Sequence, residues 1–362
     1  MDLLREAFQT VWAAADLGRF RFNLDSGTQW LASPLPLPFE VSEVREAEVK
    51  ALLTKDFNLP FNLKEEAPLR VRLLQTKPGR WVLGIVAHHL PLDGWSIARL
   101  LEKACLAYNA LRKGEAPPAL PWQPYWKYQE EYLAQLAQTG ASQNFWRAQS
   151  FSAAPLLIPY EEKTKGHRVI YILNKKFYLK VKELAKANRV TPFLLLLHAC
   201  SLALGKVLKK KEILLAVPIA NRDGDKAEFV IGNCGNLMPF ELKISEDGSA
   251  DLARLRDAYL DALPHALVPV QEIQKHHPAD LTQVHFNFEP SVEEPEIEGV
   301  ELDFFPFPVN QVEKPIIINV NDTKKTYYLE IDYQSQALEF IQALTIFTET
   351  EQRKAERRKG AG

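Results

Sequence analysis

The spacing of apolar residues along the chain alternates between the period of a helix and that of a strand. Two short segments, 69–75 and 80–87, have the pattern of strands and are joined by a turn at Pro78-Gly79. The same criteria predict further elements: a hairpin at 19–23 and 28–32; helices at the N-terminus and at 41–54, 96–111, 175–188 and 192–207; strands at 212–217, 237–244, 283–289, 316–320 and 327–333; and a closing helix from about residue 337. This mixture indicates an α/β (α+β) protein.

The strand predicted at 80–87 has a composition of its own. Residues 81–87 are apolar nearly throughout, which is typical of a central strand buried on both faces.

The pattern of helices and strands weakens between residues 139 and 166, where Ser, Ala, Pro and Lys dominate. Because 362 residues exceed what one hydrophobic core usually supports, we expect two lobes, 1–150 and 165–350. A charged tail, 351–362, should be disordered.

Composition excludes several classes of partner. The formal net charge is -2 with both signs spread along the chain, so no nucleic acid and no anionic membrane surface is expected to bind. No apolar run is long enough to span a bilayer, and no signal-peptide core opens the sequence, so we expect a cytoplasmic protein. The three cysteines, Cys105, Cys200 and Cys234, form no zinc pattern, and no metal site is predicted.

Candidate chemistry lies directly after the strand predicted at 80–87. His88 and His89 end that strand, and Asp93-Gly94 follows before the next predicted helix. Successive side chains of a strand point to opposite faces, so the two imidazoles cannot readily share a metal, and one of them should face a cleft. Asp93 can cap backbone amides or hold an arginine, and Gly94 allows a turn that other residues would resist.

Two interpretations of this cluster are open. Both histidines could be buried and hydrogen-bonded, with Asp93 as a simple helix cap. The position between an apolar strand and a helix favours a catalytic site instead, because a histidine titrates near neutral pH and can act as a general base or hydrogen-bond donor. Ser96 is interpreted as a helix cap or a packing residue, since the glycine that would complete a nucleophile elbow is replaced by Ala98.

The segment His88–Ser96 resembles the HHxxxDGWS signature of condensation domains of nonribosomal peptide synthetases, within the HHxxxDG acyltransferase superfamily. Other segments resemble that family in the same order along the chain: 60–63 and 67–70 (PFDL…PLxR), 125–128 (YxDFxxW), 217–222 (GxPxxNR), 231–236 (IGxFVN) and, more weakly, 265–269 (HxDxPF). There are departures, since Lys127 replaces Asp, and Cys234 and Gly235 replace Phe and Val. The motif RHExLRTRF survives only faintly at 16–22, and the resemblance implies that the family's first strand and part of its first helix are absent.

The resemblance implies two chloramphenicol-acetyltransferase-like lobes in a V with a central tunnel. It implies amide formation between a carrier-bound acyl or peptidyl thioester and a carrier-bound aminoacyl acceptor. His89 would carry the chemistry, and the Gly94 N–H would stabilise an oxyanion. His88 would be packed and structural, and a salt bridge between Asp93 and Arg222 would shape the site.

The partners implied are upstream and downstream peptidyl carrier proteins and an adenylation domain. The domain would have no cofactor of its own, since the phosphopantetheine belongs to the carriers. An alternative is a catalytically inactive condensation-like module that binds carrier or tailoring proteins. Epimerization is a weaker match to the residues after Gly94, and heterocyclisation is disfavoured because that activity typically has aspartates at the positions of His88 and His89.

Overall fold

The structure is a computed structural model that describes residues 1–151, 166–222, 227–245, 251–289, 296–303, 312 and 314–334. Contacts between residues group the chain into two compact units. Unit 1 contains residues 1–135, 222–235 and 292–307, and unit 2 contains residues 136–221, 236–291 and 308–362. The lobes expected at 1–150 and 165–350 stay a prediction. The predicted closing helix and charged tail lie outside the described residues.

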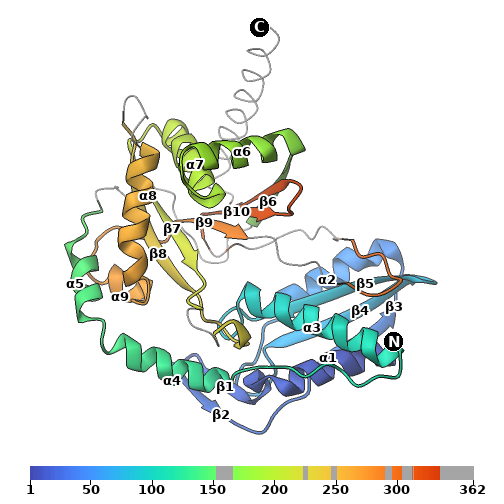
Figure 1. Cartoon of the computed structure of the whole chain (residues 1–362). Helices are drawn as coiled ribbons and strands as arrows, with labels where there is room; N and C mark the ends of the chain where they lie inside the picture. Colours follow the sequence, from blue (N-terminus) through green and yellow to red (C-terminus); the bar gives the residue numbers. More distant parts are fainter. Residues whose placement is uncertain are drawn as a thin grey trace, which may run out of the picture. The chain divides into compact units, whose positions relative to one another are not determined.

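Unit 1 is built on a three-stranded sheet in the order β3-β4-β5, in which β3 is parallel and β5 antiparallel to β4 (Figure 1). Its elements are α1 (Asp2–Ala14), η1 (Asp16–Arg19), β1 (Phe20–Asn23), β2 (Thr28–Leu31), β3 (Phe39–Glu43), η2 (Glu46–Glu48), α2 (Val49–Asn58), β4 (Leu69–Lys77), β5 (Arg80–Ala87), α3 (Gly94–Arg112) and α4 (Tyr125–Leu136). The predicted hairpin at 19–32 is present, because β1 pairs with β2 in antiparallel register.

Alternating side chains of β4 face two different cores. Leu69 and Val71 pack with α1 and α3, whereas Leu74 packs with Val49 and Leu53 of α2. The sheet is therefore covered by helices on both faces. The α2 face is so close that a Cβ added to Gly84 would lie 2.5 Å from Leu53 Cδ2, so a larger residue at this point of β5 would displace the Leu53 side chain.

The prediction that residues 81–87 form a central strand is wrong for the described residues. The middle strand of the sheet is β4, and β5 lies at its edge with residues 81–87 half-buried. Leu83 and Ile85 pack toward α1 and α3, and Val82 packs toward α2. An uninterrupted apolar run thus reflects helices on both faces and says nothing about how many strands pair with it.

The helix predicted at 41–54 is also wrong in its first half. Residues 39–43 form β3, where Val41 pairs with Leu73 of β4, and the helix α2 begins only at Val49. Backbone pairing with a neighbouring strand overrides the local helical spacing there. Among the described helices and strands, those without a counterpart in the sequence prediction are α4, α5 (Gly140–Ala148), β6 (Gly166–Leu173), α8 (Asp251–Ala262) and α9 (Val270–Gln274).

Unit 2 contains a six-stranded sheet in the order β6-β11-β10-β9-β7-β8. Its remaining elements are α6 (Lys175–Ala187), α7 (Pro192–Leu208), β7 (Glu212–Ile219), β8 (Asn236–Lys243), η4 (Leu263–His265), α9 (Val270–Gln274), β9 (Val284–Glu289), β10 (Ile316–Asp322) and β11 (Tyr327–Gln334). A further turn, η3 (Ala227–Phe229), belongs to unit 1. The strands and helices predicted after residue 175 all appear, with ends shifted by at most a few residues, up to the closing helix.

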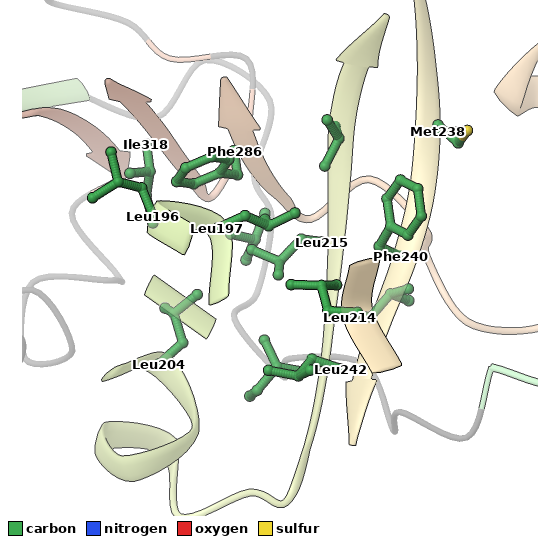
Figure 2. Close-up of a cluster of buried hydrophobic side chains, with 14 of the residues drawn as sticks. Leu196, Leu197, Leu204, Leu214, Leu215, Met238, Phe240, Leu242, Phe286 and Ile318 are labelled. Carbon is green, nitrogen blue, oxygen red and sulfur yellow. The ribbon is translucent and has the colours of Figure 1, made fainter. Parts of the chain in front are cut away.

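The core of unit 2 joins α7 to this sheet. Leu196, Leu197 and Leu204 of α7 lie in one cluster with side chains of β7, β8, β9 and β10, among them Phe286 and Ile318 (Figure 2). Thr191 caps the helix by accepting a hydrogen bond from Leu194 N at 3.2 Å, and proline follows at the first helical position.

Among the described helices, none alone is long and apolar enough to cross a bilayer. The pair α6 and α7 meets the length and composition criteria only when taken together, and the two helices are bent by 104° at the break between them.

Candidate active site

The two histidines lie on the short loop between the end of β5 and the start of α3. His88 is half-buried, and its ring lies edge-on to Phe61 with centroids 5.9 Å apart. Its backbone N–H donates to Pro68 O at 2.9 Å, and its Nδ1 accepts from Leu90 N at 3.1 Å. His89 is exposed. The alternation expected from strand geometry therefore separates the two side chains, and their functional roles remain predictions.

Asp93 caps helix α3, which begins at the next residue. Its Oδ1 accepts hydrogen bonds from Ser96 N at 2.8 Å and from Ser96 Oγ at 2.7 Å. The capping role foreseen for this carboxylate is thus present. A short polar side chain at this position satisfies amides that a helix leaves unbonded at its start.

The ion pair predicted between Asp93 and Arg222 is present in unit 1. Arg222 Nη2 lies 2.8 Å from Asp93 Oδ2 and 3.0 Å from Oδ1. The side chains are 5% and 13% exposed, respectively, so the pair is largely shielded from water. The same guanidinium donates to the carbonyls of Val230 (2.7 Å) and Gly232 (2.9 Å). The charge is therefore embedded in several hydrogen bonds, as a buried ion pair requires.

Ser96 joins this network, which sequence reasoning missed. It is fully buried, and its Oγ accepts from Gly232 N at 3.0 Å and from Arg222 Nη2 at 3.1 Å. Its own proton goes to Asp93 Oδ1 or to Gly232 O, which lies 2.9 Å away. A hydroxyl with so many partners and no exposed surface links α3 to residues 230–235.

Residues 230–235, which we call the 230–235 segment, contact the histidine loop directly. Asn233 N donates to Pro91 O and Asn233 Nδ2 donates to His89 O, both at 2.8 Å. Cys234 N donates to Asp93 Oδ2 at 3.2 Å. The sequence singles out this segment by its likeness to IGxFVN but assigns no role to Asn233.

Tyr125, at the start of α4, supports the same segment. Its hydroxyl donates to Asn233 O at 2.8 Å, and a Cβ added to Gly232 would lie 2.1 Å from its ring. Glycine is therefore required at 232 by close approach. Burial raises the pKa of the Tyr125 hydroxyl and raises that of the Cys234 thiol to about 11, so both groups stay neutral near pH 7.

We expected Gly94 to adopt a backbone turn that other residues would resist, and the structure does not show this. Gly94 is not among the glycines with positive φ, and it forms the first residue of α3. A Cβ added there would meet no described atom within 4 Å. The glycine thus leaves open space at the start of a helix, where backbone N–H groups have no partner within the helix.

The arrangement can support acid–base chemistry. It offers an exposed histidine on the loop that leads into α3, and this loop is held by a buried ion pair and by the 230–235 segment. Among the residues that the structure describes, no group of three His, Cys, Asp or Glu side chains could hold a metal ion.

Comparison with known proteins gives matches over nearly the whole chain. The family model of the condensation domain matches residues 1–350. A linear gramicidin synthase of Brevibacillus parabrevis is 29% identical over 290 residues, which are 75% of this chain and 6% of that protein. Malpinin synthetase of Mortierella alpina is 27% identical over 243 residues, 63% of this chain and 3% of that protein. The chain thus spans a small part of these synthetases.

Solved structures share the fold. VibH, described as a nonribosomal-peptide-synthetase condensation enzyme, has a TM-score of 0.75 at 20% identity, with 98% of this chain and 90% of VibH covered. The first condensation domain of the calcium-dependent antibiotic synthetase, bound to a substrate analogue, has a TM-score of 0.80 at 17% identity, covering 96% and 85%. The X-domain from teicoplanin biosynthesis, in its complex with OxyB, gives 0.75 at 18%, covering 95% and 83%. The predicted fold class is confirmed.

Proposed function

Because this chain belongs to the condensation-domain family of nonribosomal peptide synthetases, we propose that it joins a carrier-bound acyl or peptidyl thioester to a carrier-bound aminoacyl acceptor. The observation that carries the proposal is the exposed His89, on a loop whose neighbour Asp93 is fixed by Arg222 at 2.8 Å. An acyltransferase needs a base or hydrogen-bond donor that reaches its substrate, and His89 is the candidate here.

In the proposed reaction the acceptor amine attacks the thioester carbonyl carbon. A C–N bond forms, the C–S bond breaks, and the proton lost by the nitrogen ends on the departing sulfur, so the donor carrier leaves as a free thiol. His89 accepts the ammonium proton, or hydrogen-bonds and orients the amine. The Gly94 N–H, at the start of α3, stabilises the negative charge that develops on the carbonyl oxygen. The open space beside Gly94 leaves room for a pantetheine arm.

Three residues support the site in this proposal without reacting. His88 packs against Phe61, while Asp93 and Arg222 hold the loop to α3 and to the 230–235 segment. The phosphopantetheine is part of the substrates, because it is attached to the donor and acceptor carrier proteins. An adenylation domain would load the acceptor carrier, and the cytoplasm remains the proposed location.

A second candidate function is a catalytically inactive module that binds carrier or tailoring proteins. It is favoured by the likeness to the X-domain, whose solved complex contains OxyB. The complete HHxxxDG motif at His88–Gly94 favours the enzyme.

The test is a condensation assay with a panel of aminoacyl donor and acceptor carriers, read out by mass spectrometry of the acceptor-bound product. We expect amide formation by the parent chain and its loss in His89→Ala with folding retained. His276→Ala is the matched control, because His276 is also exposed but lies in unit 2. His88→Ala should chiefly reduce solubility.

Near-normal turnover by His89→Ala would overturn the role of His89. Tight binding of loaded carriers without product, across the whole panel, would favour the inactive module instead.

A further inference from the structure

Asn233 bonds to both ends of the turn that presents His89. Its backbone N–H donates to Pro91 O and its side-chain Nδ2 donates to His89 O, both at 2.8 Å. These two carbonyls flank Leu90, which is 45% exposed and supplies little packing of its own. Asn233 therefore holds this turn at two points, in addition to the burial of Pro91 and Leu92.

The orientation of the Asn233 side chain is fixed by its own neighbours. Its Oδ1 accepts from Gly235 N at 3.1 Å, so the amide nitrogen must face the His89 carbonyl. A side-chain amide bonded through both atoms has one favoured orientation, which makes the donor at His89 O a defined contact.

The backbone of Asn233 is held in turn from α4. Its carbonyl accepts from the buried Tyr125 hydroxyl at 2.8 Å. The start of α4 is itself held, because Asp16 Oδ1 accepts from Tyr125 N at 3.0 Å. Burial raises the pKa of the Asp16 carboxyl, and the backbone bonds from Tyr125 and Trp126 act in the opposite direction. A continuous set of hydrogen bonds thus runs from Asp16 to the peptide carbonyl of His89.

We propose that Asn233 is a positioning residue, which sets the direction of the His89 imidazole by holding the His89 and Pro91 carbonyls. This proposal rests on the proposed function, in which His89 is the catalytic residue. It adds a residue that touches no substrate and acts only through the loop. Displacing a catalytic group by about 1 Å can cost on the order of 100-fold in rate.

The sharpest variant is Asn233→Asp, which is isosteric and replaces the amide donor to His89 O with a carboxyl oxygen that carries no proton when it is ionised. Asn58→Asp is the matched control in the same unit, because Asn58 Nδ2 donates to a backbone carbonyl, Thr54 O, at 2.9 Å away from the histidine loop. For Asn233→Asp we expect a roughly 10- to 100-fold lower kcat with KM and thermal unfolding close to those of the parent. Asn58→Asp should leave kcat unchanged.

The pH dependence separates positioning from general destabilisation. A carboxyl group facing a carbonyl oxygen is favoured in its protonated form, so the introduced aspartate has a raised pKa and regains a donor as pH falls. The ratio of variant to parent kcat should therefore rise from about pH 8 to about pH 5.5, whereas a merely weakened fold gives a constant or falling ratio.

Hydrogen exchange gives a readout that does not need activity. Exchange at the amides of His88, His89, Leu90 and Leu92 should become faster in Asn233→Asp and stay unchanged in Asn58→Asp. Equal exchange and equal kcat in parent and Asn233→Asp overturn the proposal. If the parent forms no amide at all, the proposed function fails, and exchange alone then decides whether Asn233 holds the loop.

Discussion

Replacing Arg222 with glutamine removes the guanidinium that lies within 3.0 Å of both oxygens of Asp93. The two side chains are 5% and 13% exposed, so water cannot readily take its place. Breaking a buried pair by removing one partner typically costs about 3–5 kcal/mol, because the other charge stays buried. We expect a loss of that size in the free energy of unfolding of unit 1.

The hydrogen bonds around Arg222 give a compatible magnitude. Hydrogen bonds to charged groups contribute about 1.5–3 kcal/mol each and neutral ones about 1 kcal/mol. Arg222 makes two bonds to Asp93 and others to the carbonyls of Val230 and Gly232. One nitrogen, Nη2, serves most of them, so adding the single values overestimates the loss. The amide of glutamine can also replace one donor, which keeps the expectation near 3–5 kcal/mol.

Asp93→Asn completes a double-mutant cycle. Asparagine is as good a helix cap as aspartate, so the Ser96 N contact survives while the negative charge is lost. The variant carrying both Asp93→Asn and Arg222→Gln should lose at least about 1–2 kcal/mol less than the two single losses combined.

The assay is urea unfolding followed by circular dichroism, with hydrogen exchange to assign the transition of unit 1, because a chain of two units need not unfold in one step. If a single variant fails to fold, the double variant should still be recovered in larger amount. Losses that add within about 0.5 kcal/mol would refute the coupling.

Three further results are expected. Gly94→Leu should abolish condensation and leave the thermal transition nearly unchanged. The control is Gly140→Leu, at the first residue of α5 and equally free of neighbours within 4 Å, which should keep activity. An active Gly94→Leu enzyme would contradict the proposal. Gly232→Ala should destabilise by about 1–3 kcal/mol in chemical denaturation, because its methyl group would lie 2.1 Å from the Tyr125 ring; unchanged stability would argue against the close approach. Burial raises the pKa of the Cys234 thiol to about 11, so the protonated thiol stabilises the fold below about pH 9 and this contribution should be lost as pH rises from 9 to 11. A Cys234→Ala variant whose stability falls just as steeply over that range would contradict this assignment.

Local pattern predicted the parts of the site that lie close together in sequence. The strand before His88, the helix after Asp93 and the capping role of Asp93 all follow from residues a few positions apart. The pairing of Asp93 with Arg222, 129 residues away, came only from the likeness to a family. Residue spacing alone carries no signal for such a contact.

The residues that were missed bond across similar separations. Ser96 and Gly232 are 136 residues apart, Tyr125 and Asn233 are 108 apart, and His89 is 144 residues from Asn233. The helix prediction for residues 41–43 was wrong for a related reason, because the spacing of apolar residues in that segment does not reveal its pairing with β4. Where tertiary pairing decides the conformation, local propensity is a weak guide.

The return of residues 222–235 to unit 1 constrains how this chain can be recombined with a relative. A chimera joined between residues 150 and 165 would take Asp93, Ser96 and Tyr125 from one parent and Gly232 and Asn233 from the other. The close approach of Tyr125 to Gly232 leaves no room for a differently shaped partner. Residues 222–235 should therefore be inherited together with residues 1–135, as a second insert, in any exchange meant to keep the histidine loop intact.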